Sequence, residues 1–252
     1  MPNETPWTLK YGERTIPYSV AFVERETLEI AVHPDGAVRV RAPEGRSTEE
    51  VRAKVRSRAR WITRQQDRFA TLPTSAPRRY VSGETHRYLG RQYRLKVRRV
   101  DARAEESVRL IGPHFEVFAA GEGPKRTREL LDGWYRQRAE VKLAERYAAC
   151  AEQVRPYGIE APTLALRRMA TRWGSYTRSG RVLLHPALVK APVRCIDYVV
   201  LHELCHAAHP NHGPAFYGLL SRVLPDWREL KARLGAIPDL VGSETSSDRP
   251  IR

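Results

Sequence analysis

The sequence predicts an α+β fold in two parts: an N-terminal antiparallel β-rich lobe with one long helix, and a compact C-terminal domain that carries a metal-binding motif on a helix. Three observations support this prediction. Short β-type runs separated by turn signals fill most of the first 120 residues, a break rich in glycine follows at residues 121–124, and helical patterns dominate thereafter. We therefore expect an N-terminal lobe at residues 1–123, a C-terminal domain at 124–237 and a flexible tail at 238–252.

The length of the chain limits the number of domains, and its charge indicates the kind of partner that it attracts. Its 252 residues suffice for one large or two small domains. Lys and Arg number 44 against 29 Asp and Glu, a net charge of +15 that attracts polyanions such as nucleic acid. A genome whose codon usage favours Arg produces the same excess of positive charge. The charge therefore makes nucleic acid a candidate partner and does not establish it as one. The residues carry no signal for an oligomeric state.

The start of the chain and its cysteines favour the cytoplasm. No stretch approaches the roughly 20 apolar residues of a membrane-spanning helix, so we expect a soluble protein with no membrane partner. The first residues lack a secretion signal. Cys150, Cys195 and Cys205 are too few for a disulfide framework, and we expect free thiols. Cys205 is expected to pack in the interior rather than to bind a metal ion.

The N-terminal lobe is predicted to begin with strands and continue with a helix. β-Type runs at residues 16–23, 28–32 and 38–41 surround the turn signal at 33–36, a pattern typical of an antiparallel meander. The sequence Ser47-Thr48-Glu49-Glu50 is a helix start, and apolar residues at helical spacing extend this helix to about Ala70.

Arginines recur on that helix at intervals of four. They are Arg52, Arg56, Arg60 and Arg64, with Arg68 continuing the series. This spacing places them on one face, away from the apolar face, where they are candidates for binding nucleic-acid phosphates. A solvated helix surface produces the same pattern, and both interpretations remain open.

The rest of the chain is predicted as strands followed by helices. The expected strands are residues 80–89, 92–100, 108–111, 114–119, 164–169 and 181–185. The expected helices are residues 127–154, 194–209 and 214–234, and residues 173–175 form a loop that contains Gly174.

The predicted helix at 194–209 contains the motif that carries chemistry, His202-Glu203-Leu204-Cys205-His206. Two histidines one helical turn apart project from the same face and can grip one metal ion. Glu203 is rotated away from that face but can reach a water on the metal, which is the position of a general base. Zinc lowers the pKa of such a water towards 7, so the motif predicts a zinc-dependent hydrolase with one zinc per chain.

A catalytic zinc needs a third protein ligand. The candidates that follow the motif are His209, His212, Asp226 and Glu229. His209 would share the helical face, but three ligands along one straight helix span about 10 Å, too far for zinc bonds of about 2 Å. Pro210 turns the chain after His209 and favours His212 as the third ligand, with the two carboxylates as substitutes.

The sequence resembles the YgjP-like metallopeptidases and, more distantly, the SprT-like proteases. The matching residues are Arg172-Trp173-Gly174-Ser175, Asp197 to His206, Asn211-His212 and Phe216, with weaker similarity at Trp61-Ile62, Gly83-Glu84 and Tyr88-Leu89-Gly90. Tyr176 and His185 differ from the usual residues of the family, and neither is a metal ligand. The resemblance implies a compact zincin domain with zinc on His202, His206 and His212 and with Glu203 as the base.

By analogy with zincins, a strand beside the metal helix binds the substrate backbone, and residues 181–185 are the segment expected to do so. The candidate substrate-binding residues are Arg172, Trp173, Ser175, Leu183 and His185. A tryptophan at a tight turn is more often simply a core residue, and this interpretation of Trp173 also remains open.

Three functions follow from these residues. The first is a zinc metallopeptidase acting on a peptide or protein. The second keeps the metal but hydrolyses nucleotides, as a nucleoside triphosphate pyrophosphatase does, and the positive charge would favour such a substrate. The third is a nucleic-acid-associated protease recruited by the basic N-terminal lobe.

Overall fold

A computed structural model gives the structure of the chain and describes residues 4–33, 35–71, 78–121, 123–169, 172–237 and 244–245. The chain divides into two compact units. The N-terminal unit comprises residues 1–74, 170–172 and 241–252, and the C-terminal unit comprises 75–169 and 173–240. This division differs from the boundary expected at residue 123, because the second group of strands shares a core with the C-terminal helices.

The N-terminal unit contains a five-stranded sheet. Its strands are β1 (Thr5–Tyr11), β2 (Arg14–Val23), β3 (Glu29–Val32), β4 (Val38–Pro43) and β12 (Glu244–Thr245), in the order β1-β2-β4-β3-β12. The predicted turn at 33–36 is confirmed, since His33 donates its backbone N–H to Ala37 across 2.8 Å. The predicted meander is wrong: β4 inserts between β2 and β3 and pairs with β2 in parallel. Strand β1 was not predicted, because Pro6 interrupts its pattern.

Two helices cover this sheet. The helix expected to run unbroken to Ala70 is divided into α1 (Thr48–Ser57) and α2 (Ala59–Thr71) at Arg58, whose φ and ψ are −102° and 3°. Ser47 and Glu50 form the expected capping box. Val51, Val55 and Ile62 are fully buried in one core with the sheet residues Val20 and Val40.

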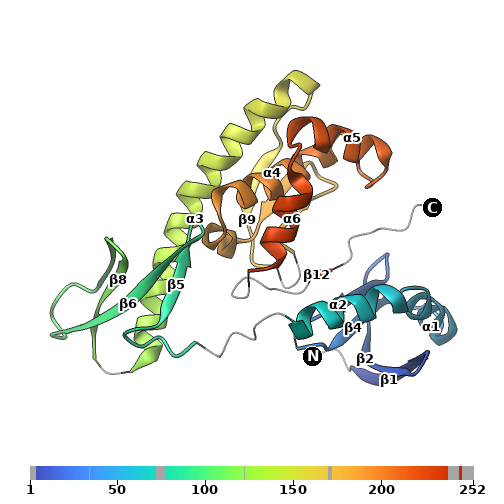
Figure 1. Cartoon of the computed structure of the whole chain (residues 1–252), viewed down its shortest axis with the longest axis horizontal. Coiled ribbons are helices and arrows are strands. Elements are labelled where there is room, and N and C mark those ends of the chain that lie inside the picture. Colours follow the sequence, from blue (N-terminus) through green and yellow to red (C-terminus); the bar gives the residue numbers. More distant parts are fainter. Residues whose placement is uncertain are drawn as a thin grey trace. The chain divides into compact units, whose positions relative to one another are not determined.

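The C-terminal unit begins with a four-stranded sheet in the order β5-β6-β8-β7. The strands are β5 (Thr85–Tyr88), β6 (Arg91–Val100), β7 (Ser107–Ile111) and β8 (His114–Ala120). This sheet packs on the first half of the long helix α3 (Pro124–Val154), as Figure 1 shows, and the rings of Phe115 and Trp134 meet at 4.9 Å. Proline at the first helical position explains why α3 starts sharply after the glycine-rich break.

The second half of α3 shares one hydrophobic core with the elements that surround the motif. They are β9 (Thr163–Leu166), β10 (Gly174–Tyr176), β11 (Arg181–Leu184), the 3-10 turn η2 (Pro186–Lys190), α4 (Val193–Ala208), α5 (Pro214–Val223) and α6 (Trp227–Gly235), with the 3-10 turn η1 (Arg155–Tyr157) after α3. Within this unit, α4 lies beside α3 in Figure 1, and Arg146 of α3 donates to the buried Asp197 of α4 across 2.7 Å.

Two expectations for this region need correction, and a third lies largely outside the described residues. The loop expected at residues 173–175 contains strand β10, and the helix expected at 214–234 is two helices, separated near Pro225. The predicted tail at 238–252 lies outside the described residues, except for Glu244–Thr245, which pairs with β3. Among the described residues, no helix is long and apolar enough to cross a membrane.

Candidate metal centre

Helix α4 is buried on nearly all sides. Its aliphatic residues Ile196, Val200, Leu201 and Leu204 are fully buried, as is Cys205. Such a helix is fixed by packing, so the side chains on its one polar strip are held in place. The helix ends at His209, whose φ and ψ of −132° and 96° are extended, because the proline that follows disfavours the helical conformation.

The chain turns after His209 and returns a third histidine to the helix. His212 precedes the first residue of α5, Pro214, and its Nε2 lies 2.9 Å from Nε2 of His202. The ligand nitrogens of His202, His206 and His212 all lie within 4.8 Å of one another. Two imidazole nitrogens that face each other this closely share either a proton or a metal ion. The arrangement therefore suits one ion with bonds of about 2.0–2.1 Å to each ring.

Hydrogen bonding at the end of α4 fixes which nitrogen of His206 faces the cluster. Its Nδ1 lies 3.1 Å from the backbone carbonyl of His209 and donates to it. Nε2 then carries the lone pair, which is the tautomer that a metal ligand needs. His209 thus contributes its carbonyl, while its imidazole is not part of the three-histidine cluster.

The ring of Phe216, from α5, is the common support of the three histidines. Its centroid lies 5.0 Å from that of His202, 4.7 Å from His206 and 4.6 Å from His212. Phe216 is itself fully buried. A rigid apolar ring against all three imidazoles restricts their rotation and reduces access of water from that side.

The environment keeps His202 neutral. Burial lowers the pKa of His202 well below its ordinary value, and the charges of His206, His212 and Lys231 lower it further. A neutral imidazole retains the lone pair that binds a cation. A donor set of three imidazole nitrogens fits zinc.

Glu203 lies beside this cluster, on the wall formed by β10. Its side chain is only 7% exposed. Gly174 is the residue that leaves room for it: a Cβ atom at Gly174 would lie 2.7 Å from both Cγ and Oε1 of Glu203 and 2.9 Å from Val199. No carbon side chain fits at that position, so Gly174 fixes how closely the carboxylate approaches the strand.

Among the described strands, β10 pairs with β11 alone and is one edge of its sheet. The order is β10-β11-β9, so β11 is paired on both sides, antiparallel to β10 and parallel to β9. The expectation that residues 181–185 accept an added substrate strand is therefore wrong, because the backbone groups of β11 are already used. The carbonyl of Trp173 accepts from the N–H of His185, and the N–H of Thr177 donates to the carbonyl of Arg181. The alternation of an antiparallel ladder therefore directs the N–H and C=O groups of Gly174 and Tyr176 outward.

The predicted substrate-binding residues lie in several environments. Ser175 and Leu183 are cross-strand partners, so they project from the sheet face opposite to the one that Gly174 turns towards α4. Trp173 packs edge-on against His185 at 5.6 Å, and Nδ1 of His185 accepts from the backbone of Ala187. Arg172 groups with the N-terminal unit, where its guanidinium lies 3.8 Å from Glu29.

The other candidates are not members of the three-histidine cluster. Asp226 accepts two hydrogen bonds from Arg194, at 2.9 and 3.0 Å, and Glu229 is exposed on α6. Cys205 is buried, and burial raises the pKa of its thiol to about 12, which keeps it protonated. The predicted phosphate-binding residues Arg52, Arg56, Arg60 and Arg64 are exposed on α1 and α2, in the N-terminal unit.

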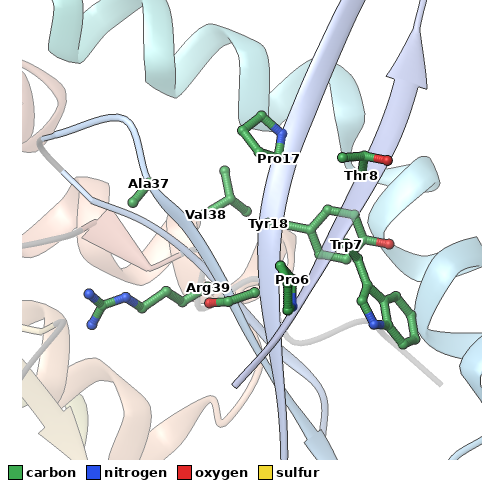
Figure 2. Close-up of a pocket in the computed structure, with 9 residues that line it drawn as sticks. Pro6, Trp7, Thr8, Pro17, Tyr18, Ala37, Val38 and Arg39 are labelled. Atoms are coloured by element: carbon green, nitrogen blue, oxygen red, sulfur yellow. The ribbon is translucent and has the colours of Figure 1, made fainter. Parts of the chain in front are cut away.

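Sequence reasoning did not give Gly174 or Phe216 a role in the site. The only signal was their place in the family-like motifs, because neither carries a chemical group. A separate pocket of about 390 Å³ opens on the N-terminal sheet, lined by Trp7, Tyr18 and Arg39 among others (Figure 2). No residue of the histidine cluster lines it.

A buried helix with two histidines, a third histidine on the following turn and an adjacent carboxylate define a candidate mononuclear metal centre. The profile of the family described as YgjP-like, metallopeptidase domain, matches residues 26–236. The chain therefore belongs to the YgjP-like metallopeptidase family, as the sequence motifs predicted. Among solved structures, it is similar to the crystal structure of the metallopeptidase zymogen abylysin from Pyrococcus abyssi, at 18% identity and a TM-score of 0.34, over 37% of this chain and 91% of that chain. None of the curated proteins matches.

Proposed function

We propose that the protein is a zinc-dependent metallopeptidase in which His202, His206 and His212 hold one zinc ion and Glu203 is the general base. The observation that carries the proposal is the convergence of three imidazole nitrogens within 4.8 Å beside the buried Glu203. Three protein ligands leave a fourth position for water or substrate, as in catalytic rather than structural zinc sites. When bound, the zinc supplies Lewis acidity, which lowers the pKa of water and polarises the scissile carbonyl.

Glu203 performs the proton transfers. Its carboxylate takes the proton of the attacking water and gives it to the amine that leaves. Because Glu203 is one residue from His202, the helix fixes its place relative to the cluster, and the absence of a Cβ at Gly174 fixes it from the other side. A base held in this way loses little conformational freedom in reaching the reactive geometry.

The free edge of β10 is the proposed place of the substrate. An extended peptide can add to it as a strand, with its backbone hydrogen-bonded to the outward N–H and C=O groups of Gly174 and Tyr176. Recognition through the backbone favours unfolded or extended polypeptides over folded ones and makes few demands on side chains. This is why we favour a peptide substrate over a nucleotide.

The test compares the wild type with Glu203→Gln, with Glu229→Gln as a control that removes an exposed carboxylate of the same unit. Zinc content is measured by elemental analysis, and hydrolysis is measured with an unfolded protein and, separately, with nucleoside triphosphates. We expect about one zinc per chain in all three proteins, and loss of at least 1,000-fold in peptide hydrolysis only in Glu203→Gln, because an amide cannot accept the proton. Hydrolysis of the triphosphates with no peptide cleavage would contradict the proposal.

A further inference from the structure

The sheet β5-β6-β8-β7 has two faces of different character. Leu95, Phe115 and Val117 are fully buried on the face that packs against α3. Because side chains alternate along a strand, the residues between them project from the opposite face. On that face Arg94, Arg98 and Arg109 are exposed.

Basic residues form rows across this exposed face. The strand pairing gives the rows Arg94–His114–Ile111, Lys96–Glu116–Arg109 and Arg98–Phe118–Ser107, running from β6 across β8 to β7. Arg94, Lys96 and Arg98 are therefore successive along one side of β6, at about 7 Å intervals. We call the residues of these three rows the basic sheet face.

Little negative charge offsets these cations. Residues 91–100 contain five Arg and Lys and no Asp or Glu. Glu116 is the one carboxylate of the basic sheet face, and Arg98 lies 3.2 Å from it. The hydrogen bond from Arg98 lowers the pKa of Glu116, so the carboxylate stays ionised and offsets one of the four cations.

An aromatic ring lies among the cations. The guanidinium of Arg109 sits over the ring of Phe118, 5.3 Å from its centroid. Phe118 is partly exposed. A cation stacked on an accessible ring presents a flat surface on which a nucleobase can stack.

We propose that the basic sheet face binds the backbone of single-stranded nucleic acid. Along β6, the side chains of Arg94, Lys96 and Arg98 bind successive phosphates. A base stacks on Phe118 and Arg109. Three of the four cations are arginines, whose planar groups bind phosphate through two hydrogen bonds. The sheet and α4 belong to one compact unit through α3, so a bound strand would hold the peptidase site near proteins on that nucleic acid.

An acidic protein is the less suitable partner for this face. Protein interfaces derive most of their energy from aromatic or arginine anchors that enter pockets of the partner. The only exposed large apolar residue of the basic sheet face is Ile111 at 50% exposure. The flat arrangement of cations around one ring matches the contacts made with single strands, which are phosphate pairs and stacking.

The experiment measures fluorescence anisotropy of a labelled oligothymidylate of about 20 nucleotides with the full chain, from 50 to 300 mM salt. The variant Arg94→Gln/Lys96→Gln/Arg98→Gln removes three positive charges from the basic sheet face. The control Arg56→Gln/Arg60→Gln/Arg64→Gln removes three from the N-terminal unit and so has the same net charge. We expect at least a tenfold loss of affinity at 100 mM salt in the first variant and less than threefold in the control. The slope of log K against log salt should fall by about 2 in the first variant, at roughly 0.7 per phosphate.

Phe118→Leu tests the stacking. It keeps an apolar side chain, and we expect about a fivefold loss for the single strand and no loss for a duplex of the same length. Equal losses in the two triple variants would overturn the proposal, because net charge alone would then explain binding. Absence of binding by the wild type at 50 mM salt, or competition by polyglutamate as effective as that by unlabelled oligothymidylate, would overturn it as well. None of these measurements depends on peptidase activity.

Discussion

Two helical regions of this protein place like residues at intervals of four, with different consequences. On α4, His202 and His206 project from a helix whose surroundings are buried, and His212 meets them from another element. On α1 and α2, the residues Arg52, Arg56, Arg60 and Arg64 are exposed to solvent, and residues 48–71 contain seven basic and three acidic residues. The comparison teaches that spacing determines which residues share a face, whereas burial and a residue from a second element make a site.

The two helical regions differ because burial removes water from the histidines but not from the arginines. Desolvation lowers the pKa of His202 and keeps its lone pair available. An exposed arginine stays hydrated, and its interactions are screened by salt. Removing one residue should therefore have a large effect on α4 and a small one on α1 and α2, and the following predictions test that difference in order of decreasing effect.

The largest effect is expected from His206→Ala. It removes one of the two proposed ligands on α4, and zinc content should fall from about one per chain to below about 0.1, with loss of hydrolysis. Zinc should raise the melting temperature of the wild type and leave that of the variant unchanged, because a ligand stabilises only the state that binds it. Elemental analysis and thermal melting with and without a chelator measure both. Full zinc occupancy in the variant would show that His206 is not a ligand.

The second prediction tests whether His212 or His209 is the third zinc ligand. We expect His212→Ala to weaken zinc binding by at least 100-fold, because the third imidazole is lost. We expect His209→Ala to retain zinc, because this residue contributes its backbone carbonyl, which the substitution preserves. Competition with a zinc-binding dye gives both affinities. The reverse result, a large loss only in His209→Ala, would mean that the turn after α4 is arranged differently in solution.

The third effect concerns the wall of the site. In Gly174→Ala the new Cβ would meet Glu203 and Val199 at under 3 Å, so the carboxylate must move. We expect kcat/KM to fall by about 10- to 100-fold with zinc retained, and stability to fall by about 1–3 kcal/mol from overpacking. Gly133→Ala on α3 is the matched control, since nothing lies within 4 Å of its Cβ, and alanine there should stabilise by about 0.5–1 kcal/mol. Wild-type activity in Gly174→Ala would show that Glu203 does not depend on this close approach.

The sequence was most informative where a local pattern determines the structure. Helices α3 and α4 and the capping box at Ser47 were predicted, because periodicity and caps are local. The parallel pairing of β2 with β4 was not, because it depends on a long-range choice of neighbour. Strand β10 was taken for a loop, since a run of three residues containing glycine has no strand signal until β11 pairs with it.

In the candidate site, too, local features were predicted from the sequence and long-range ones were not. The place of His206 relative to His202 follows from one helical turn, and the proline after His209 correctly predicted a turn there. Residues 181–185 were expected to accept an added strand although they contain the central strand of their sheet, because strand order is a property of the assembled sheet. Gly174 and Phe216 act by shape alone, so only packing reveals what they support.

The smallest effect is expected where the residues are most exposed. Replacing Arg52, Arg56, Arg60 and Arg64 together by Gln removes four charges from α1 and α2. If the comparison between the two helical regions holds, nucleic-acid affinity at 100 mM salt falls by less than about threefold and zinc content is unchanged, because hydrated side chains contribute little individually. Arg52 is the exception within the set, since its guanidinium lies 5.0 Å from the ring centroid of Trp7, a contact worth about 0.5–1 kcal/mol of stability at an exposed position. Arg52→Gln alone should therefore account for most of the lower melting temperature of the quadruple variant, which thermal unfolding of both proteins measures. A tenfold loss of affinity in the quadruple variant would instead make this helix surface a binding site, and the arginine spacing alone would then have been sufficient to identify it.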